Sequence, residues 1–181
     1  MIRAFISVNL TPEIRKKIGE AGQSFSMRGI KLVEPELVHV TLKFLGNIEE
    51  GRVGDIEAAL KSLTVKPFLA GFRSIGGFPN TRSPRVIWIG AQGDFSVLNE
   101  QVEALMEGLG FKREGRFEPH VTIGRVKFPT PEQRQKLPQL FEKYRDYEAG
   151  SMYVDSICLM RSTLGPNGPK YDVLKEIKLA R

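Results

Sequence analysis

A single offset of 81 positions relates two stretches of this chain, and this repetition constrains the fold more than any other feature. The chain has two histidines, which open the stretches HVTLKFLG at His39 and HVTIGRV at His120. The same offset places AFISVNL, from Ala4, on RVIWIGA, from Arg85. Each of these apolar runs leads into a helical stretch and then into a strand that carries His-Val-Thr. The sequence therefore predicts two copies of one strand-helix-strand unit within a single two-lobed domain, residues 1–181.

Alternating apolar residues, many of them β-branched, predict seven strands, and four helical stretches lie between them. The expected strands are Arg3–Leu10, Leu37–Leu45, Phe68–Ile75, Arg85–Ala91, Pro119–Lys127, Met152–Met160 and Lys170–Leu179. The expected helices are Thr11–Met27, Glu49–Leu63, Asp94–Leu109 and Pro131–Arg145. In a duplicated unit with a shared interior, equivalent strands lie around a pseudo-twofold axis, so we expect the two histidines to face each other across a cleft.

Composition narrows the classes of protein. The 181 residues fit one compact unit, and no run approaches the roughly 20 apolar residues of a membrane span. We expect a cytoplasmic monomer without membrane association, since no targeting segment is evident. A net charge of +6 favours an anionic partner. The single cysteine, Cys158, lies in an apolar run and is expected to be a small buried residue rather than a nucleophile.

The histidine tripeptides indicate acid-base chemistry. On a strand, residues two apart share a face, about 6.6 Å from each other, so each strand would present one imidazole and one hydroxyl, from His39 and Thr41 or from His120 and Thr122. One imidazole can act as a base while the other acts as an acid near neutral pH. Displacement at phosphorus needs this division, and threonine hydroxyls suit the non-bridging oxygens. The pattern favours phosphoester chemistry without a metal.

Other kinds of site fit less well. A zinc site needs three or four ligands, and the only carboxylates that approach a shared-face pattern with the histidines are distant ones such as Glu36 and Glu118. The chain contains neither a G-x-x-x-x-G-K-[ST] nor a G-x-G-x-x-G run, so no nucleotide cofactor is expected. There is likewise no G-x-S-x-G nucleophile motif. We therefore expect no metal and no cofactor.

The two histidine motifs resemble the signatures of the two-histidine phosphoesterases, and within them the RNA 2′,3′-cyclic phosphodiesterases of the 2′-5′ RNA ligase type. The similarity extends to IRAFISVNLTPEI at the start and LMRSTLGPNGPKYDVL near the end. It implies an α+β fold of two pseudosymmetric lobes of antiparallel sheet, with helices outside and a central groove. It also implies hydrolysis of a terminal 2′,3′-cyclic phosphate on RNA to a 2′-phosphomonoester, with joining of tRNA halves in some members.

Carried onto this chain, the resemblance makes His39 the acid toward the leaving O3′ and His120 the base for water. It also implies a functional arginine at Arg125. Strict alternation puts Arg125 on the face opposite His120, and a bulge at Gly124 would turn it back toward the phosphate; an ordinary surface ion pair is the alternative. Phe44 holds the matching place after His39, where its parity with Val40 favours core packing over stacking on a base.

Two other functions stay open at the level of sequence. One is a phosphodiesterase of a small cyclic phosphate, such as that of ADP-ribose. The other is a non-catalytic protein that holds RNA ends in a basic groove, whose binding would be sensitive to salt. Nothing in the residues separates hydrolysis from ligation.

Overall fold

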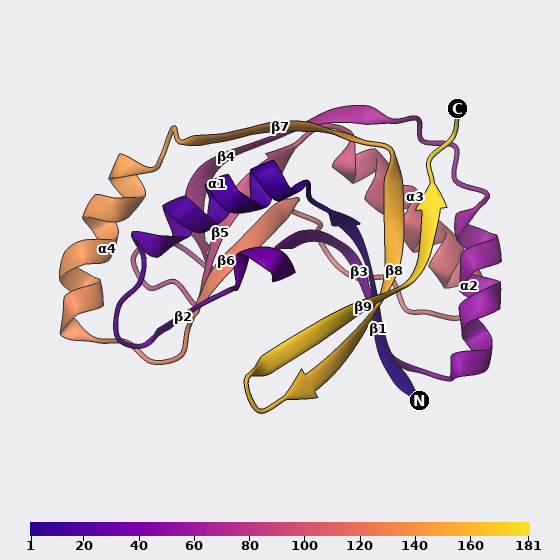
Figure 1. Ribbon diagram of the computed structural model, residues 1–181, viewed down its shortest axis with the longest axis horizontal. Coiled ribbons are helices and arrows are strands. Elements are labelled where there is room, and N and C mark those ends of the chain that lie inside the picture. The colour runs from indigo at the N-terminus through magenta and orange to yellow at the C-terminus, as the bar shows by residue number, and fades with distance from the viewer.

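The computed structural model describes all residues, 1–181, as helices packed on one continuous curled sheet (Figure 1). The strands are β1 (Ile2–Asn9), β2 (Ile30–Leu32), β3 (His39–Ile48), β4 (Phe68–Phe78), β5 (Val86–Gln92), β6 (His120–Val126), β7 (Glu148–Val154), β8 (Ser156–Gly165) and β9 (Gly168–Lys178). The helices are α1 (Pro12–Gln23), α2 (Val53–Leu60), α3 (Phe95–Gly108) and α4 (Pro131–Lys143), with short 3₁₀ turns η1 (Pro35–Leu37) and η2 (Glu50–Arg52). The predicted α+β class with antiparallel strands is confirmed.

The helices begin where the sequence places capping residues. Thr11 and Thr130 each precede a proline, and each hydroxyl accepts a hydrogen bond from the backbone N–H three residues on, Ile14 for α1 and Gln133 for α4. Proline suits the first turn because its missing N–H has no partner there. Two helices are shorter than predicted: α1 ends at Gln23, and the start of the predicted second helix is the 3₁₀ turn η2.

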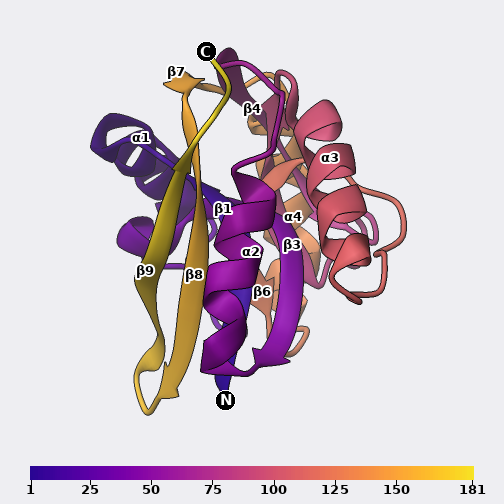
Figure 2. The ribbon, with the colours of Figure 1, turned by 90° about the vertical axis from the view of Figure 1, so that its right-hand side faces the viewer.

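The sheet is arranged symmetrically about its two central strands. Its order is β7-β4-β5-β6-β3-β1-β8-β9, with β2 paired to β6, so four strands extend on either side of the junction between β6 and β3. Figure 1 shows α4 at one end of the molecule and α2 with α3 at the other. Figure 2 shows β8 and β9 side by side as a long hairpin that projects beyond the helices. No helix is both long and apolar enough to cross a membrane.

The offset of 81 positions also relates the hydrogen-bonded registers of the two halves. In the first half Val8 pairs with Val40, and in the second Ile89 pairs with Val121, each partner 81 positions further on. The agreement extends to an irregularity, because one extra residue interrupts β3 at Leu42 and β6 at Ile123. The two central hairpins therefore have the same local architecture, including a β-bulge at the same place.

One predicted strand was wrong. Met152–Met160 is not continuous: it is divided at Asp155 between β7, which pairs with β4, and β8, which pairs with β1. The chain passes here from one half of the sheet to the other, so the alternation of apolar residues continues while the neighbouring strands change. The sequence prediction also missed β2, whose three residues are too few to show a period.

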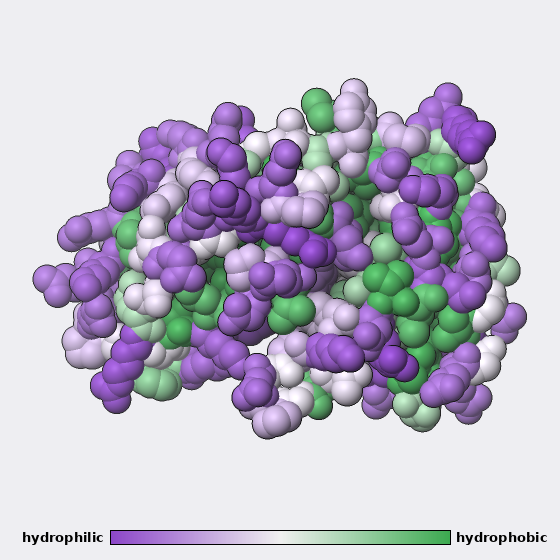
Figure 3. All heavy atoms as spheres, in the orientation of Figure 1, coloured by the Kyte–Doolittle hydropathy of each residue, from purple (hydrophilic) through white to green (hydrophobic).

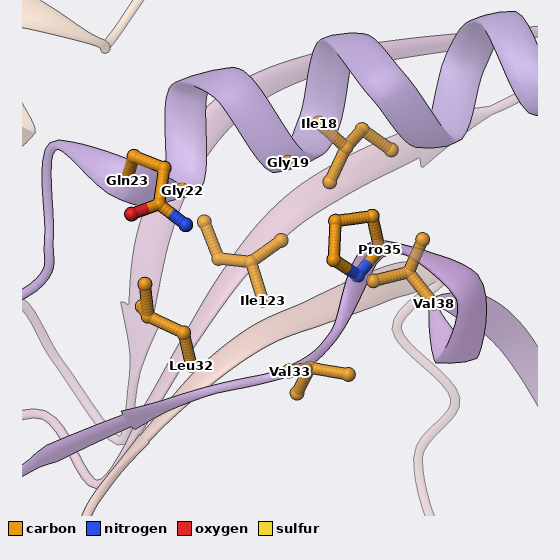
Figure 4. A pocket seen from close by; sticks show the side chains of 9 residues that line it. All are labelled: Ile18, Gly19, Gly22, Gln23, Leu32, Val33, Pro35, Val38 and Ile123. Atoms are coloured by element: carbon orange, nitrogen blue, oxygen red, sulfur yellow. The ribbon is translucent and has the colours of Figure 1, made fainter.

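The main core fills the side of the sheet covered by the helices and leaves the histidine side open. It contains 39 buried apolar residues. A water-sized cavity of about 10 Å³ lies in this layer beneath α1, where Figure 4 shows Ile18 of the helix above Pro35 and Ile123. On the opposite side of the sheet, Phe5, Cys158 and Met160 form a separate small apolar cluster with Tyr171 packed against it. Cys158 is buried as predicted, and this burial raises the pKa of its thiol to about 11.

Candidate active site

The two histidines come together where the halves of the sheet meet. Strands β3 and β6 are joined antiparallel through Val40 and Val121. In that register His39 and His120 are diagonal neighbours, a relation that corresponds to a separation of about 7–8 Å in antiparallel strands. Both histidines and both threonines, Thr41 and Thr122, are half-buried, whereas Val40 and Val121 are fully buried on the other face. The structure thus places two imidazoles and two hydroxyls on one face, as alternation predicts.

Backbone carbonyl groups orient both imidazole rings in the same way. Nδ1 of His39 lies 2.7 Å from the carbonyl oxygen of Leu37, and Nδ1 of His120 lies 2.7 Å from that of Glu118. A carbonyl oxygen only accepts hydrogen bonds, so Nδ1 carries a hydrogen in both rings. Nε2 is then the atom of each ring that exchanges a proton with a substrate. Nε2 of His39 lies 2.9 Å from Oγ1 of Thr41, and Nε2 of His120 has no protein partner.

The surroundings of the two rings differ. The His39 ring lies 5.0 Å from the ring of Phe5 and 5.4 Å from that of Tyr171, while the His120 ring lies 5.0 Å from that of Phe78. Burial lowers the pKa of His39 from its ordinary value, and the charges of nearby cationic groups lower it further, whereas the hydrogen bond to Leu37 opposes the shift. Those cationic groups are Arg15, His120 and Arg125. His39 is therefore largely neutral at neutral pH in the absence of an anion.

The β-bulges decide which side chains after the histidines reach the site. Because Ile123 is an extra residue in β6, Arg125 pairs with Val86 and lies on the same face as Thr122 rather than the opposite one. The bulge that the sequence suggested at Gly124 is present one residue earlier. Arg125 forms no ion pair, is exposed, and is close enough for its charge to act on His39. Arg125 is therefore not part of a surface ion pair, which was the alternative expected from the sequence.

The prediction of core packing for Phe44 was wrong for the same reason. The extra residue Leu42 shifts the alternation of β3, so Phe44 pairs with Phe5 and shares its face. Its side chain is 58% exposed, and its ring lies 6.4 Å from that of Phe5. Strict alternation failed at both positions because a bulge reverses the parity of every later residue in the strand.

Four neighbours of the histidines were missed from the sequence: Phe5 on β1, Arg15 on α1, Phe78 on β4 and Tyr171 on β9. None belongs to either histidine stretch, and each reaches the site only through the curl of the sheet or the packing of a helix. Phe5 and Tyr171 lie within the N-terminal and C-terminal stretches that resemble the family, which was the one available signal. Burial raises the pKa of the Tyr171 phenol, so it stays neutral.

Titration of His39 should show the effect of its surroundings. We expect the His39 ring to titrate below pH 6.5, because burial and neighbouring positive charges disfavour its protonated form. Arg15→Gln removes one of these charges and should move the His39 pKa upward. Lys17→Gln removes a charge from the same helix and should leave it in place. NMR of the imidazole resonances, assigned with single histidine variants, measures the His39 pKa in the wild type and in each variant; a wild-type value above 6.5 would contradict the expectation.

Known proteins resemble this chain over nearly its whole length. A family described as LigT-like phosphoesterase matches twice, over residues 8–88 and 90–171, and each match contains one histidine. A protein of Methanocaldococcus jannaschii named RNA 2′,3′-cyclic phosphodiesterase is 40% identical over 176 residues, which cover 97% of this chain and 99% of that protein. One of the same name from Archaeoglobus fulgidus is 38% identical, covering 96% and 98%.

Solved structures agree with the observed fold. The crystal structure of the protein TT0787 of Thermus thermophilus superposes with a TM-score of 0.83 at 32% identity, covering 98% of each chain. The structure of Escherichia coli LigT complexed with 3′-AMP gives a TM-score of 0.79, covering 99% of each chain, although the identity is 21%. Since the family match covers most of the chain and close relatives cover nearly all of it, this chain belongs to the LigT-like phosphoesterase family.

Proposed function

We propose that this protein is an RNA 2′,3′-cyclic phosphodiesterase, which opens a terminal 2′,3′-cyclic phosphate to a 2′-phosphomonoester. The observation that carries the proposal is the pair of imidazoles on one face, each held through Nδ1 by a backbone carbonyl so that Nε2 is directed to a substrate. The name of the relatives from Methanocaldococcus jannaschii and Archaeoglobus fulgidus supports it. The exposed Arg125 on the same face supplies a positive charge for the phosphate.

The reaction divides between the two rings. Nε2 of His120, which has no protein partner, accepts a proton from water as the water oxygen bonds to phosphorus. The P–O3′ bond breaks, and Nε2–H of His39 donates its proton to O3′. The 2′-oxygen keeps the phosphoryl group, and proton exchange with solvent restores both rings. Thr41, Thr122 and Arg125 stabilise the charge that develops on the non-bridging oxygens.

The lowered pKa of His39 bears on this assignment of acid and base. An acid must be protonated, yet burial and nearby cations favour the neutral ring in the free protein. A cyclic phosphate brings a negative charge to the same face, which raises the pKa of His39 again and partly neutralises Arg125. Substrate binding would thus favour the protonated form of His39, the form that can act as the acid. In the absence of a substrate, His39 would be neutral.

The same site would support joining. If the 5′-hydroxyl of a second RNA replaces water, His120 takes the proton of that hydroxyl as its oxygen bonds to phosphorus. The P–O3′ bond breaks, His39 protonates O3′, and the phosphorus stays on O2′, which gives a 2′-5′ linkage. We propose that this joining reaction is reversible and that its substrates are tRNA halves. We also propose that residues 1–181 form one domain that arose by duplication, which the shared register of the two halves and the double family match support. A monomeric state and a cytoplasmic location stay predictions.

A product analysis tests the proposal. The protein is incubated with an oligonucleotide ending in 2′,3′-cyclic phosphate, in the presence of a chelator, and the product isomer is identified. We expect a 2′-phosphate and undiminished turnover with chelator, since all the groups in the reaction are side chains. A 3′-phosphate would contradict the role of O3′ as leaving group. Binding without conversion over hours would instead favour a protein that holds RNA ends, and turnover restricted to ADP-ribose cyclic phosphate would favour a small-molecule enzyme.

A further inference from the structure

Two cations lie side by side next to the site without a counter-ion. Lys31 of β2 and Arg125 of β6 are cross-strand partners, so their side chains share a face, the one that carries the histidines. Both are exposed, and neither forms an ion pair with any carboxylate. Like charges directly opposite each other on a sheet repel. Such a pair is suited to a ligand that brings negative charge to both positions.

The hairpin of β8 and β9 reaches this pair from the other half of the sheet. Tyr171, three residues from the turn of the hairpin, contacts His39, and at the turn itself a side-chain carbon on Gly168 would lie 3.7 Å from Nζ of Lys31. The hairpin therefore runs beside the whole distance from His39 to Lys31. Figure 1 shows its tip projecting toward the side of the molecule that carries β2.

The charges of the hairpin itself do not compete for an anion. Arg161 and Lys170 both lie close to Asp172, at 3.2 Å and 3.8 Å, so their charges are partly neutralised within the hairpin. Lys31 is thus a cation near the tip that remains without an ion-pair partner. Figure 3 shows that hydrophilic residues predominate on the side of the molecule drawn there, and that its largest apolar patch lies beside α2.

We propose that Lys31 binds the internucleotide phosphate that precedes the terminal nucleotide, while Arg125 binds the reacting phosphate. This inference rests on the proposed function. Arg125 is the member of the pair whose charge acts on His39, so it belongs to the reacting end. Lys31 lies one strand further out, about 5 Å away across the sheet. The site therefore takes an RNA strand of at least two nucleotides, with the strand leaving between β2 and the tip of the hairpin.

A comparison of two substrates tests this subsite. One is a mononucleotide 2′,3′-cyclic phosphate, which lacks the preceding phosphate, and the other is a dinucleotide that ends in the same group. We expect wild-type protein to prefer the dinucleotide in kcat/KM and Lys31→Ala to lose about tenfold of this preference. With a non-reacting dinucleotide that carries a terminal 2′-phosphate, the slope of log Kd against log salt should fall by about 0.7 in the variant, the loss of one phosphate contact.

Lys66→Ala is the matched control. Lys66 is an exposed lysine without an ion pair, on the loop between α2 and β4, near the end of β9 that lies far from the tip. It should keep both the preference and the salt slope. An equal loss on both substrates in Lys31→Ala would overturn the proposal, because Lys31 would then act on the reacting phosphate; an unaltered preference would overturn it too. Wild-type protein that converts neither substrate would instead refute the proposed function.

Discussion

Replacing either histidine by alanine is expected to lower turnover of a 2′,3′-cyclic phosphate by at least about 10²-fold, the usual scale for a general acid or base. His39→Ala and His120→Ala remove half-buried side chains from the open face of the sheet and leave the main core untouched. Each variant should therefore fold. Steady-state kinetics on a cyclic mononucleotide, with circular dichroism as a check of the fold, measure the effect.

The two losses should not add. The rings act in one displacement, so the double variant should be only slightly slower than either single one. Each variant should also lose one limb of the bell-shaped dependence of kcat/KM on pH, because that limb reports the ring that was removed. Turnover close to that of the wild type in both single variants would exclude the proposed chemistry.

Lys43→Met is expected to destabilise the fold by about 3–5 kcal/mol, the range for breaking a buried ion pair. Lys43 is 1% exposed, and its ammonium lies 2.8 Å from the carboxylate of Glu103 on α3 and 2.9 Å from the carbonyl oxygen of Lys112. Methionine would leave that carboxylate buried without its counter-charge. Urea unfolding, followed by circular dichroism, measures the free energy of unfolding.

Two controls separate this effect from a general sensitivity of the protein. Lys43→Met combined with Glu103→Leu removes both charges and should recover much of the lost stability. Glu132→Gln breaks an exposed ion pair on α4, in which Oε1 of Glu132 lies 2.7 Å from Nζ of Lys136. This change should alter the free energy of unfolding by less than about 1 kcal/mol. If Lys43→Met cost no more than Glu132→Gln, the pair would not anchor β3 to α3.

The sequence predicted the parts of the site that follow from local periodicity. Thr-Pro starts of helices, the strands of the two repeats and the common face of His39 and His120 depend on neighbours in the chain. The rule that successive residues of a strand point to opposite faces gave the wrong face after Leu42 and after Ile123, because one inserted residue at each position moves every later residue to the other face. The pattern of apolar residues does not mark such an insertion. Arg15 and Tyr171 were out of reach because long-range packing brings them to His39.

The bulges at Leu42 and Ile123 give the two halves equivalent positions filled by unlike side chains. Phe44 and Arg125 both follow the inserted residue by two places, and both lie on the histidine face. One offers a flat aromatic surface and the other a positive charge. A nucleotide is likewise unlike at its two ends, with a planar base and an anionic phosphate. The two halves of the sheet are thus equivalent in backbone but different in side chains at these positions. The site would therefore accept the end of an RNA strand in a single orientation.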